Sequence, residues 1–436
     1  MAYDDVLVDD VDTIDAVRWN SMITALAGKS VTAHAHDEFH IYPYSNHYYI
    51  YTDGSTYYAK NMSTGAIDYS GISFDTVFAA VVADISYAGF IKLGKGFFYT
   101  VGLATGYKSI IIEGSGWGIG TLITSNPGTV IMSNIDDDTY LLTLGEHGYT
   151  TEGAGIRNLM FCHTPAYTKC LGAVDLYNTV NSFVDHCYFG GFEAGTPTPI
   201  NSISIRGATD ELVGGWCNHA RFNHIVNPDI GINLGANANY CVIEGNNIEG
   251  SGTGTAHGIK CDGTGASTAS PYGCMLTGNR IRNFDYGASR GLWITAGSNN
   301  SGRHTVSGNV FNENAINYEV TSGTGIGECT FVGNVLGAAG TSKALDSGNV
   351  QSYYYNNKNY VRENWGAVSK ANGDTVTHSL DTTPTSVVAT GTVANEVITV
   401  TAIGTTTFTV SIKKFDPIGG VWTAGTTQTI YWRAWI

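Results

Sequence analysis

The sequence predicts an all-β chain whose main part is a right-handed parallel β-helix, a solenoid of stacked three-sided coils. Three observations predict this fold. A short apolar–polar–turn–apolar pattern recurs between residues 156 and 336. No helical period of 3.6 residues runs through this region. The composition is rich in turn residues and poor in charge, with 55 Gly among 436 residues and 14% charged residues, against about 25% charged in an average domain.

The recurring pattern defines the coils. Its order is an apolar residue, a polar residue, a small or turn residue, a marker that is often Asn, any residue, and a second apolar residue. The markers are Leu159, Cys187, Asn223, Asn246, Asn279, Asn309 and Asn334. Irregular periods of about 20 to 40 residues are typical of coils of one size that carry loops of different length.

The Asn markers predict a ladder inside the stack. Gly-Asn pairs at 245–246, 278–279, 308–309 and 333–334 fall in one turn column. A side-chain amide can bond to its counterpart in the next coil and satisfy the turn backbone. We therefore interpret these Asn residues as structural.

Further strands follow the markers, and a helix precedes the first coil. The strand-like segments are 231–237, 258–264, 291–297 and 317–323. Residues 75–87 form an apolar stretch of helical length, followed by two strand-like runs within 89–101. Such a helix would cover the open end of the stack and shield its first edge.

These features resemble the pectate-lyase-like β-helix superfamily, as found in tail-spikes of phages and archaeal viruses and in capsule depolymerases. The resemblance covers roughly 60–365 and rests on the entry helix, the strand–Gly–strand step and the Ile-x-Gly-x-Gly segment at 112–116. The superfamily holds lyases, hydrolases, epimerases and non-enzymatic binders, so the fold alone does not choose among them. The segment 183–186 resembles the aromatic-Ile-Asp-His strand of pectate lyases, but their Arg-x-Pro-x-x-Arg segment is absent, and 257–260 only echoes a polygalacturonase motif.

The resemblance suggests three parts. We expect an N-terminal attachment or oligomerisation segment at 1–60, the β-helix at 61–365, and a C-terminal antiparallel β-sandwich at 366–436 that trimerises or binds glycan. In the first part, His34 and His36 form a His-x-His pair. Three chains around a threefold axis would bring six imidazoles together for a metal ion, which is the only cofactor the sequence suggests; the alternative is a solvated polar loop.

A polar column within the repeat is the first candidate for catalysis. Its members include Asp185, Arg221 and Glu244 in successive coils. At about 4.8 Å per coil, the two acids would stand roughly 9.6 Å apart, near the upper limit of about 9.5 Å for an inverting pair of carboxylates. The alternative is a charge ladder whose neighbours neutralise each other.

Four aromatic residues are candidate platforms for sugar rings. They are Trp216, Tyr240 and Trp293 in the β-helix region and Trp432 near the C-terminus. Long loops on a rigid stack are where ligand contacts usually lie. Trp432 could equally fill the core of the sandwich or a trimer interface.

Net charge, the lengths of the apolar stretches and the first 16 residues limit the partners and the location that the sequence predicts. A net charge of −15 disfavours nucleic acid, and no apolar stretch is long enough to predict membrane insertion. The acidic stretch 1–16 does not read as a secretory signal, which predicts assembly in a host cytoplasm. The cysteines, without a CxxC pair, read as small buried hydrophobes.

The prediction is therefore a homotrimeric spike or fibre of a virion tail, joined to the tail or baseplate through its N-terminus. It would act outside the cell, binding a host surface polysaccharide and depolymerising it if it carries a catalytic site. Two alternatives are a non-enzymatic fibre or adhesin of the same fold and a free extracellular polysaccharide lyase or hydrolase.

Overall fold

The structure is a computed structural model. It describes residues 47–117, 128–134, 139–163, 171–190, 201–208, 214–251, 254–263, 270–295, 302–321, 328–346, 353–358, 363–378, 380 and 383–435. His34 and His36 lie outside the described residues.

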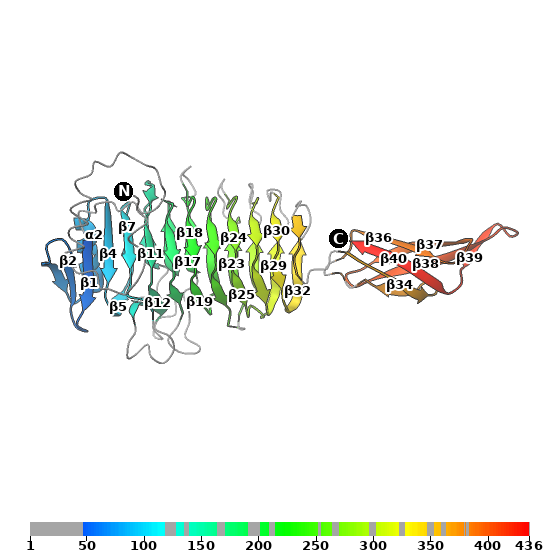
Figure 1. Ribbon diagram of the computed structural model, residues 1–436, viewed down its shortest axis with the longest axis horizontal. Coiled ribbons are helices and arrows are strands. Elements are labelled where there is room, and N and C mark those ends of the chain that lie inside the picture. Colours follow the sequence, from blue (N-terminus) through cyan, green and yellow to red (C-terminus); the bar gives the residue numbers. More distant parts are fainter. Residues whose placement is uncertain are drawn as a thin grey trace, which may run out of the picture. The chain divides into compact units, whose positions relative to one another are not determined.

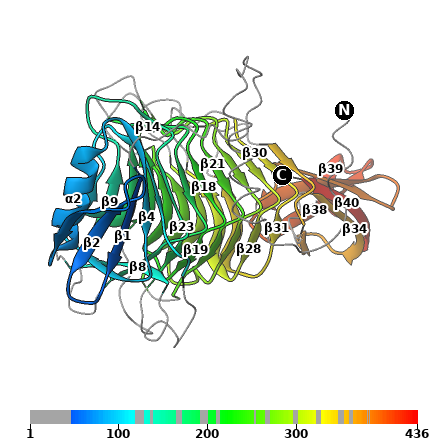
Figure 2. The same cartoon turned by 60° about the vertical axis from the view of Figure 1, so that its left-hand side comes forward.

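Three sheets form the sides of the solenoid, and from residue 88 on their strands run parallel, with one strand of each coil in each sheet (Figures 1 and 2). Sheet 1 contains β3 (Ile67–Gly71), β2 (Tyr57–Asn61), β1 (His47–Thr52), β4 (Ala88–Leu93), β7 (Ser109–Glu113), β11 (Gly155–Arg157), β15 (Phe183–Asp185), β18 (His219–Arg221), β21 (Val242–Glu244), β24 (Met275–Thr277), β27 (Thr305–Ser307), β30 (Thr330–Val332) and β33 (Tyr353–Tyr355). Sheet 2 contains β5 (Gly96–Thr100), β8 (Thr129–Ser133), β12 (Met160–His163), β16 (Tyr188–Phe189), β19 (His224–Val226), β22 (Asn247–Glu249), β25 (Arg280–Arg282), β28 (Val310–Asn312) and β31 (Val335–Leu336). Sheet 3 contains β6 (Leu103–Ala104), β9 (Tyr140–Leu144), β13 (Gly172–Tyr177), β17 (Asn201–Arg206), β20 (Ile230–Leu234), β23 (His257–Cys261), β26 (Arg290–Ile294), β29 (Asn314–Val320) and β32 (Ala339–Asp346). β1, β2 and β3 extend sheet 1 at its first edge, and the β1–β2 and β2–β3 pairs are antiparallel. A short pair, β10 (Thr151–Glu152) and β14 (Thr179–Val180), lies at a corner. The predicted right-handed parallel β-helix is confirmed.

The core lies inside the three sheets because the two apolar positions of each repeat point inward. In sheet 1, Ile243, Leu276 and Val306 are in register and buried. In sheet 2, Ile248, Ile281 and Phe311 do the same. Side chains alternate between the two faces of a strand, so the polar residue beside each apolar one faces outward.

The predicted asparagine ladder is confirmed. From Asn223 through Asn246, Asn279, Asn309 and Asn334 to Asn357, each side-chain amide donates to the side-chain oxygen of the next Asn at 2.9–3.0 Å. The turn residue before each of these Asn residues has a positive φ, which Gly adopts without strain at 245, 278, 308 and 333. The Gly-Asn pairs are thus explained by backbone geometry and turn satisfaction.

The predicted capping helix is present as α2 (Phe74–Asp84), which begins at the N-cap residue Ser73. It buries Phe74, Phe78 and Val81 in the core cluster. The predicted boundary at residue 60 falls inside β2. β1 pairs with β4, and β2 and β3 extend the same sheet, so the described chain joins sheet 1 from residue 47.

The C-terminal part is an antiparallel β-sandwich, as predicted. One sheet contains β34 (Glu363–Lys370), β40 (Gln428–Trp435) and β36 (Ser386–Gly391). The other contains β35 (Thr375–Thr377), β38 (Thr407–Asp416), β37 (Glu396–Ile403) and β39 (Val421–Ala424). Phe408 and Val410 of one sheet share a core with Ile430 and Trp432 of the other. β34 begins at Glu363, a few residues before the predicted boundary.

Within the described ranges, no helix has the length and apolarity needed to cross a membrane. Six of the seven described cysteines are buried, and none is in a disulfide. The same part of the chain holds no cluster of side chains suited to a metal ion.

Candidate glycan-binding site

The predicted polar column exists on the outer face of sheet 1. Arg157, Asp185, Arg221, Glu244 and Thr277 are paired in this order by strand register. Asp185 and Glu244 therefore stand two strands apart with Arg221 between them, as the repeat predicted. Their catalytic role stays a prediction.

The contacts within this column favour its interpretation as a charge ladder. Arg221 holds Asp185 in a two-pronged ion pair, with Nε to Oδ1 at 3.2 Å and Nη2 to Oδ2 at 2.7 Å. Glu113 likewise accepts from both Lys92 and Arg157. Paired charges on neighbouring parallel strands neutralise each other and hold the register.

A second polar surface lies on the outer face of sheet 3. In β23 and β26, Ile259, Cys261, Leu292 and Ile294 point into the core. Alternation then places Lys260 and Trp293 on the outer face, where the strand register makes them direct neighbours. We call this surface, formed by the outward residues of β20, β23 and β26, the Trp293 face.

Trp293 stands among cations and an imidazole. The guanidinium carbon of Arg290 lies 4.3 Å from the centre of its ring, and the ammonium of Lys260 lies 5.0 Å from it. The His257 ring centre is 4.7 Å away, at an angle of 53°. Such contacts hold the indole in place because each cation is attracted to the face of the aromatic ring.

The cations of this surface are also paired with carboxylates. Lys260 bonds Asp262 at 2.8 Å, and Arg290 bonds Glu319. Beyond this face, on the preceding strands β17 and β13, Arg206 holds the buried Asp175 with three hydrogen bonds. The Trp293 face is therefore close to electrically neutral, and its planar polar groups are held in fixed orientations.

Three polar atoms of the Trp293 face are buried and have no hydrogen-bond partner among the described residues. They are Asn233 Oδ1, His257 Nδ1 and Trp293 Nε1, from three successive strands of sheet 3. Burial, with Arg290 and Lys260 nearby, lowers the pKa of His257 to about 4. At neutral pH the imidazole is uncharged, so its two nitrogens offer one donor and one acceptor.

The other predicted aromatics lie elsewhere. Trp216 and Tyr240 are exposed between sheet 3 and sheet 1, in successive coils, on the connections that follow β17 and β20. Trp432 is buried in the sandwich, where its ring packs edge-on against Phe408 at 5.5 Å. Trp432 thus fills the core of the sandwich, which is the alternative interpretation given above. A sugar ring could stack on it only after that core opened.

Trp293 is among the candidates that the sequence suggests, whereas its neighbours on this face are not, and its role stays a prediction. In the sequence, His257 and Lys260 belong only to the motif-like segment 257–260, and no motif contains Arg290. Aligning the strand-like segments 258–264 and 291–297 on their apolar positions would have placed Lys260 beside Trp293. On sheet 1, His219 was missed in the same way; burial and the charge of Arg221 lower its pKa.

A comparison with protein-family models finds no match, and a comparison with curated proteins finds none either. Among solved structures, the chain is similar to an alginate lyase from Paenibacillus sp. strain FPU-7, with 14% identity and a TM-score of 0.47, over 65% of this chain and 92% of the lyase. It is similar to a protein of Geobacillus virus E2, with 11% identity and a TM-score of 0.38, over 80% and 82%. It is also similar to the tailspike of Acinetobacter baumannii bacteriophage Fri1, a capsular polysaccharide depolymerase, with 11% identity and a TM-score of 0.37, over 83% and 81%. All three likenesses have identities of 14% or less and TM-scores below 0.5. The residues of this chain carry the functional argument.

Proposed function

We propose that this chain is a spike of a virion tail that binds a host surface polysaccharide, and that the Trp293 face is its binding site on the β-helix. The observation that carries the proposal is the set of three buried polar atoms without a partner on successive strands of the described part of sheet 3, one of which is the indole nitrogen of Trp293. A buried polar atom without a partner is costly. Sugar hydroxyls can both donate and accept, so a bound saccharide would satisfy all three.

The chemistry of this face suits a saccharide better than a highly charged ligand. Trp293 offers apolar ring surface, while the ion-paired side chains beside it present fixed donors and acceptors. A few convergent polar groups around an aromatic surface are typical of small-ligand sites. Because Lys260 and Arg290 are already paired with carboxylates, binding should depend weakly on salt.

The proposed spike is a homotrimer attached through its N-terminal segment. The small sandwich that follows the β-helix supports this arrangement, and the N-terminal attachment segment stays a prediction from the sequence. The sandwich has a small core and exposes several large apolar side chains, among them Phe415, Ile418 and Trp422. Contacts between chains would cover such surfaces.

The test measures binding of the purified chain to immobilised bacterial surface polysaccharides by biolayer interferometry. Trp293→Ala should weaken binding of the recognised glycan at least about tenfold, since it removes the platform and one donor. Tyr355→Ala is the matched control, because Tyr355 is an exposed aromatic on the outer face of sheet 1. Equal affinity of Trp293→Ala and the parent chain would reject this face as the site.

Cleavage of the polysaccharide by Asp185 and Glu244 is a second candidate function. It is favoured by their register, which sets two carboxylates on one face, two strands apart. An inverting hydrolase needs one acid and one base with room for a water between them. Arg221, which stands between the two acids, would have to release Asp185 or bind the sugar as well.

This second function is tested with the double variant Asp185→Asn, Glu244→Gln on whichever polysaccharide binds. Release of reducing ends should fall to background in the double variant if the pair is catalytic, while binding persists. Unchanged release of reducing ends rejects the pair. Binding by the parent chain without any release favours the non-enzymatic adhesin.

A further inference from the structure

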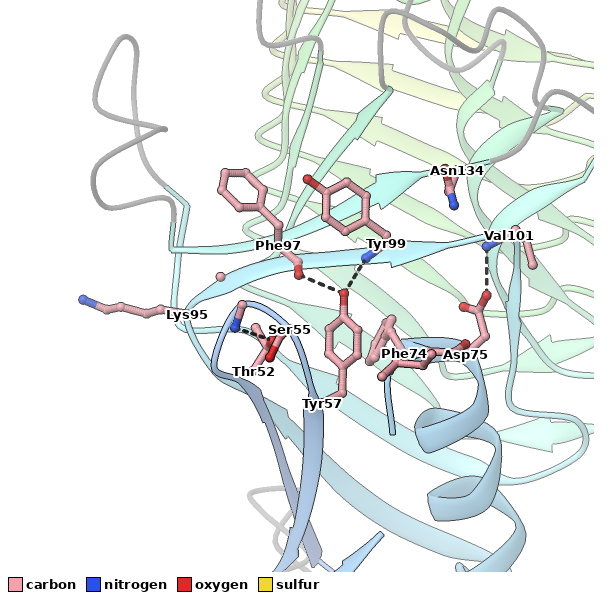
Figure 3. A pocket seen from close by; sticks show the side chains of 14 residues that line it. Thr52, Ser55, Tyr57, Phe74, Asp75, Lys95, Phe97, Tyr99, Val101 and Asn134 are labelled. Atoms are coloured by element: carbon pink, nitrogen blue, oxygen red, sulfur yellow. Dashed lines mark hydrogen bonds between the residues drawn. The ribbon is translucent and has the colours of Figure 1, made fainter. Parts of the chain in front are cut away.

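A pocket of about 870 Å³ opens at the α2 end of the β-helix, away from the Trp293 face (Figure 3). Its walls come from the turn between β1 and β2, the start of α2, and the outer side of β5. Ser55, Tyr57, Asp75, Lys95, Phe97, Tyr99 and Asn134 are among the residues that line it. Ligand pockets usually have volumes of roughly 300 to 1,000 Å³.

The pocket follows the free edge of sheet 2. β5 is the last strand of that sheet and pairs with β8 on one side. On its other side, side chains take the place of a neighbouring strand (Figure 3). The Tyr57 hydroxyl donates to the carbonyl of Phe97 at 3.4 Å and accepts from the amide of Tyr99 at 3.5 Å. Asp75 Oδ2 accepts from the amide of Val101 at 3.1 Å.

The Asp75 carboxylate can accept a further hydrogen bond. Its second carboxylate oxygen, Oδ1, is buried and has no hydrogen-bond partner in the part of the chain that the structure describes. The Val101 amide fixes the carboxylate through the other oxygen. A ligand with hydroxyl donors would therefore meet an acceptor that is already oriented.

Aromatic and apolar surface faces the same space. Tyr99 is 46% exposed, and its ring stands beside that of Phe97, at 6.5 Å between ring centres. Ile72 and Val101 are exposed at the rim. Asn134 also lines the pocket, and in Figure 3 the Val101 backbone is drawn between it and the Asp75 carboxylate. A carboxylate, an amide and an exposed aromatic ring around one cavity suit a ligand that is both hydroxylated and apolar on one face.

We propose that this pocket is a second saccharide site, which binds one or two neutral sugar units with hydroxyls on Asp75 and Asn134 and a ring face against Tyr99. It is separate from the Trp293 face. The strand order of sheet 3 puts six strand steps between β6, which follows β5, and β26, which is roughly 29 Å along the stack. The Asp75 charge disfavours a ligand that carries a carboxylate of its own.

The test uses the methyl glycosides of glucose, galactose, mannose and N-acetylglucosamine, with methyl glucuronide as the charged comparison, in saturation-transfer NMR titrations of the full chain. At least one neutral glycoside should bind. Asp75→Asn keeps an oxygen for Val101 but exchanges the free acceptor for a donor. It should weaken binding roughly tenfold or more, as should Tyr99→Ala.

Tyr107→Ala is the matched control, because Tyr107 is an exposed tyrosine outside the pocket, and it should bind as the parent chain does. Unchanged melting temperatures show that the variants fold. Absence of binding by every neutral glycoside, tighter binding of the glucuronide, or undiminished binding by both pocket variants overturns the proposal. If Trp293→Ala abolished binding of the glycosides, the proposal would also be overturned. Failure of the polysaccharide to bind at the Trp293 face would leave the proposal standing.

Discussion

The side-chain amide of Asn279 donates to the side-chain oxygen of Asn309, one coil further along the stack, at 2.9 Å. The same nitrogen donates to the carbonyl of Ile243 at 2.9 Å. The Asn279 oxygen accepts from both the backbone amide and the side chain of Asn246. Every hydrogen-bonding position of one side chain is thus used to join three coils.

Replacing Asn279 by Ala should lower the free energy of unfolding by about 3 kcal/mol or more, because several buried groups lose their partners at once. Asn247→Ala is the matched control, since Asn247 is outside the ladder and, among the described residues, its side chain has one hydrogen-bond contact, with His224 at 3.3 Å, while its Oδ1 has no partner there. Denaturant unfolding of both variants measures the difference. Equal losses would show that the ladder adds nothing beyond ordinary packing.

Removing Arg206 should destabilise the chain by about 3–5 kcal/mol, because it leaves the buried Asp175 without a counter-ion. Burial already raises the pKa of Asp175, and loss of Arg206 raises it further. A raised carboxyl pKa makes the folded state bind the proton more readily than the unfolded state. The deficit of Arg206→Ala should therefore shrink as pH falls.

The difference in free energy of unfolding between Arg206→Ala and the parent chain is measured at acidic and neutral pH. Arg280→Ala is the control, because Arg280 is an exposed arginine. A deficit that stays constant with pH would contradict the assignment to Asp175.

His257 should make the chain less stable in mild acid. Its pKa is lowered from 6.5 to about 4 by burial and by the two nearby cations. Between these values the unfolded state binds a proton that the folded state does not, so the free energy of unfolding falls as pH decreases through this window. The largest contribution is about 3 kcal/mol.

His257→Gln should flatten the pH dependence of stability between pH 6.5 and 4, which denaturant unfolding measures directly. His219 and His224 also have lowered pKa values, so some slope remains in the variant. An identical slope in parent and variant would show that His257 is not the titrating group.

Light scattering tests the trimer. The expected molar mass is three times the 46.4 kDa of one chain. Metal analysis of the purified trimer, with His34→Ala as the comparison, tests the predicted ion at the threefold axis. A stable monomer would remove both the trimer and the metal hypothesis and would favour a free-standing glycan-active protein.

The fold was predictable because its determinants are local and repeated. The Gly-Asn pairs indicate the turns whose backbone has a positive φ at Gly. The apolar positions on either side of these pairs determine the strand register of sheets 1 and 2. The start of the sheet was predicted less well. β1 and β2 are tyrosine-rich hairpin strands without the marker pattern, so nothing in the repeat indicated that they join sheet 1.

The candidate site was only partly predictable, because it depends on which outward residues become neighbours. The column of Asp185, Arg221 and Glu244 follows from the repeat itself. The similar segments 258–264 and 291–297 relate Lys260 to Trp293, but His257 and Arg290 precede these segments, and no pattern in the sequence indicates that they contact the indole. The pocket beside β5 brings together a turn, a helix start and a strand edge, which no spacing in the sequence relates.

The most direct test of the proposed function is ¹⁹F NMR of the chain labelled with 5-fluorotryptophan, titrated with the recognised polysaccharide. The chain has eight Trp residues, and the signal of Trp293 is assigned with Trp293→Phe. Binding at the Trp293 face predicts that this signal shifts or broadens first while that of Trp432, buried in the sandwich, stays unchanged. A titration in which the polysaccharide binds and the Trp293 signal does not move would contradict the account.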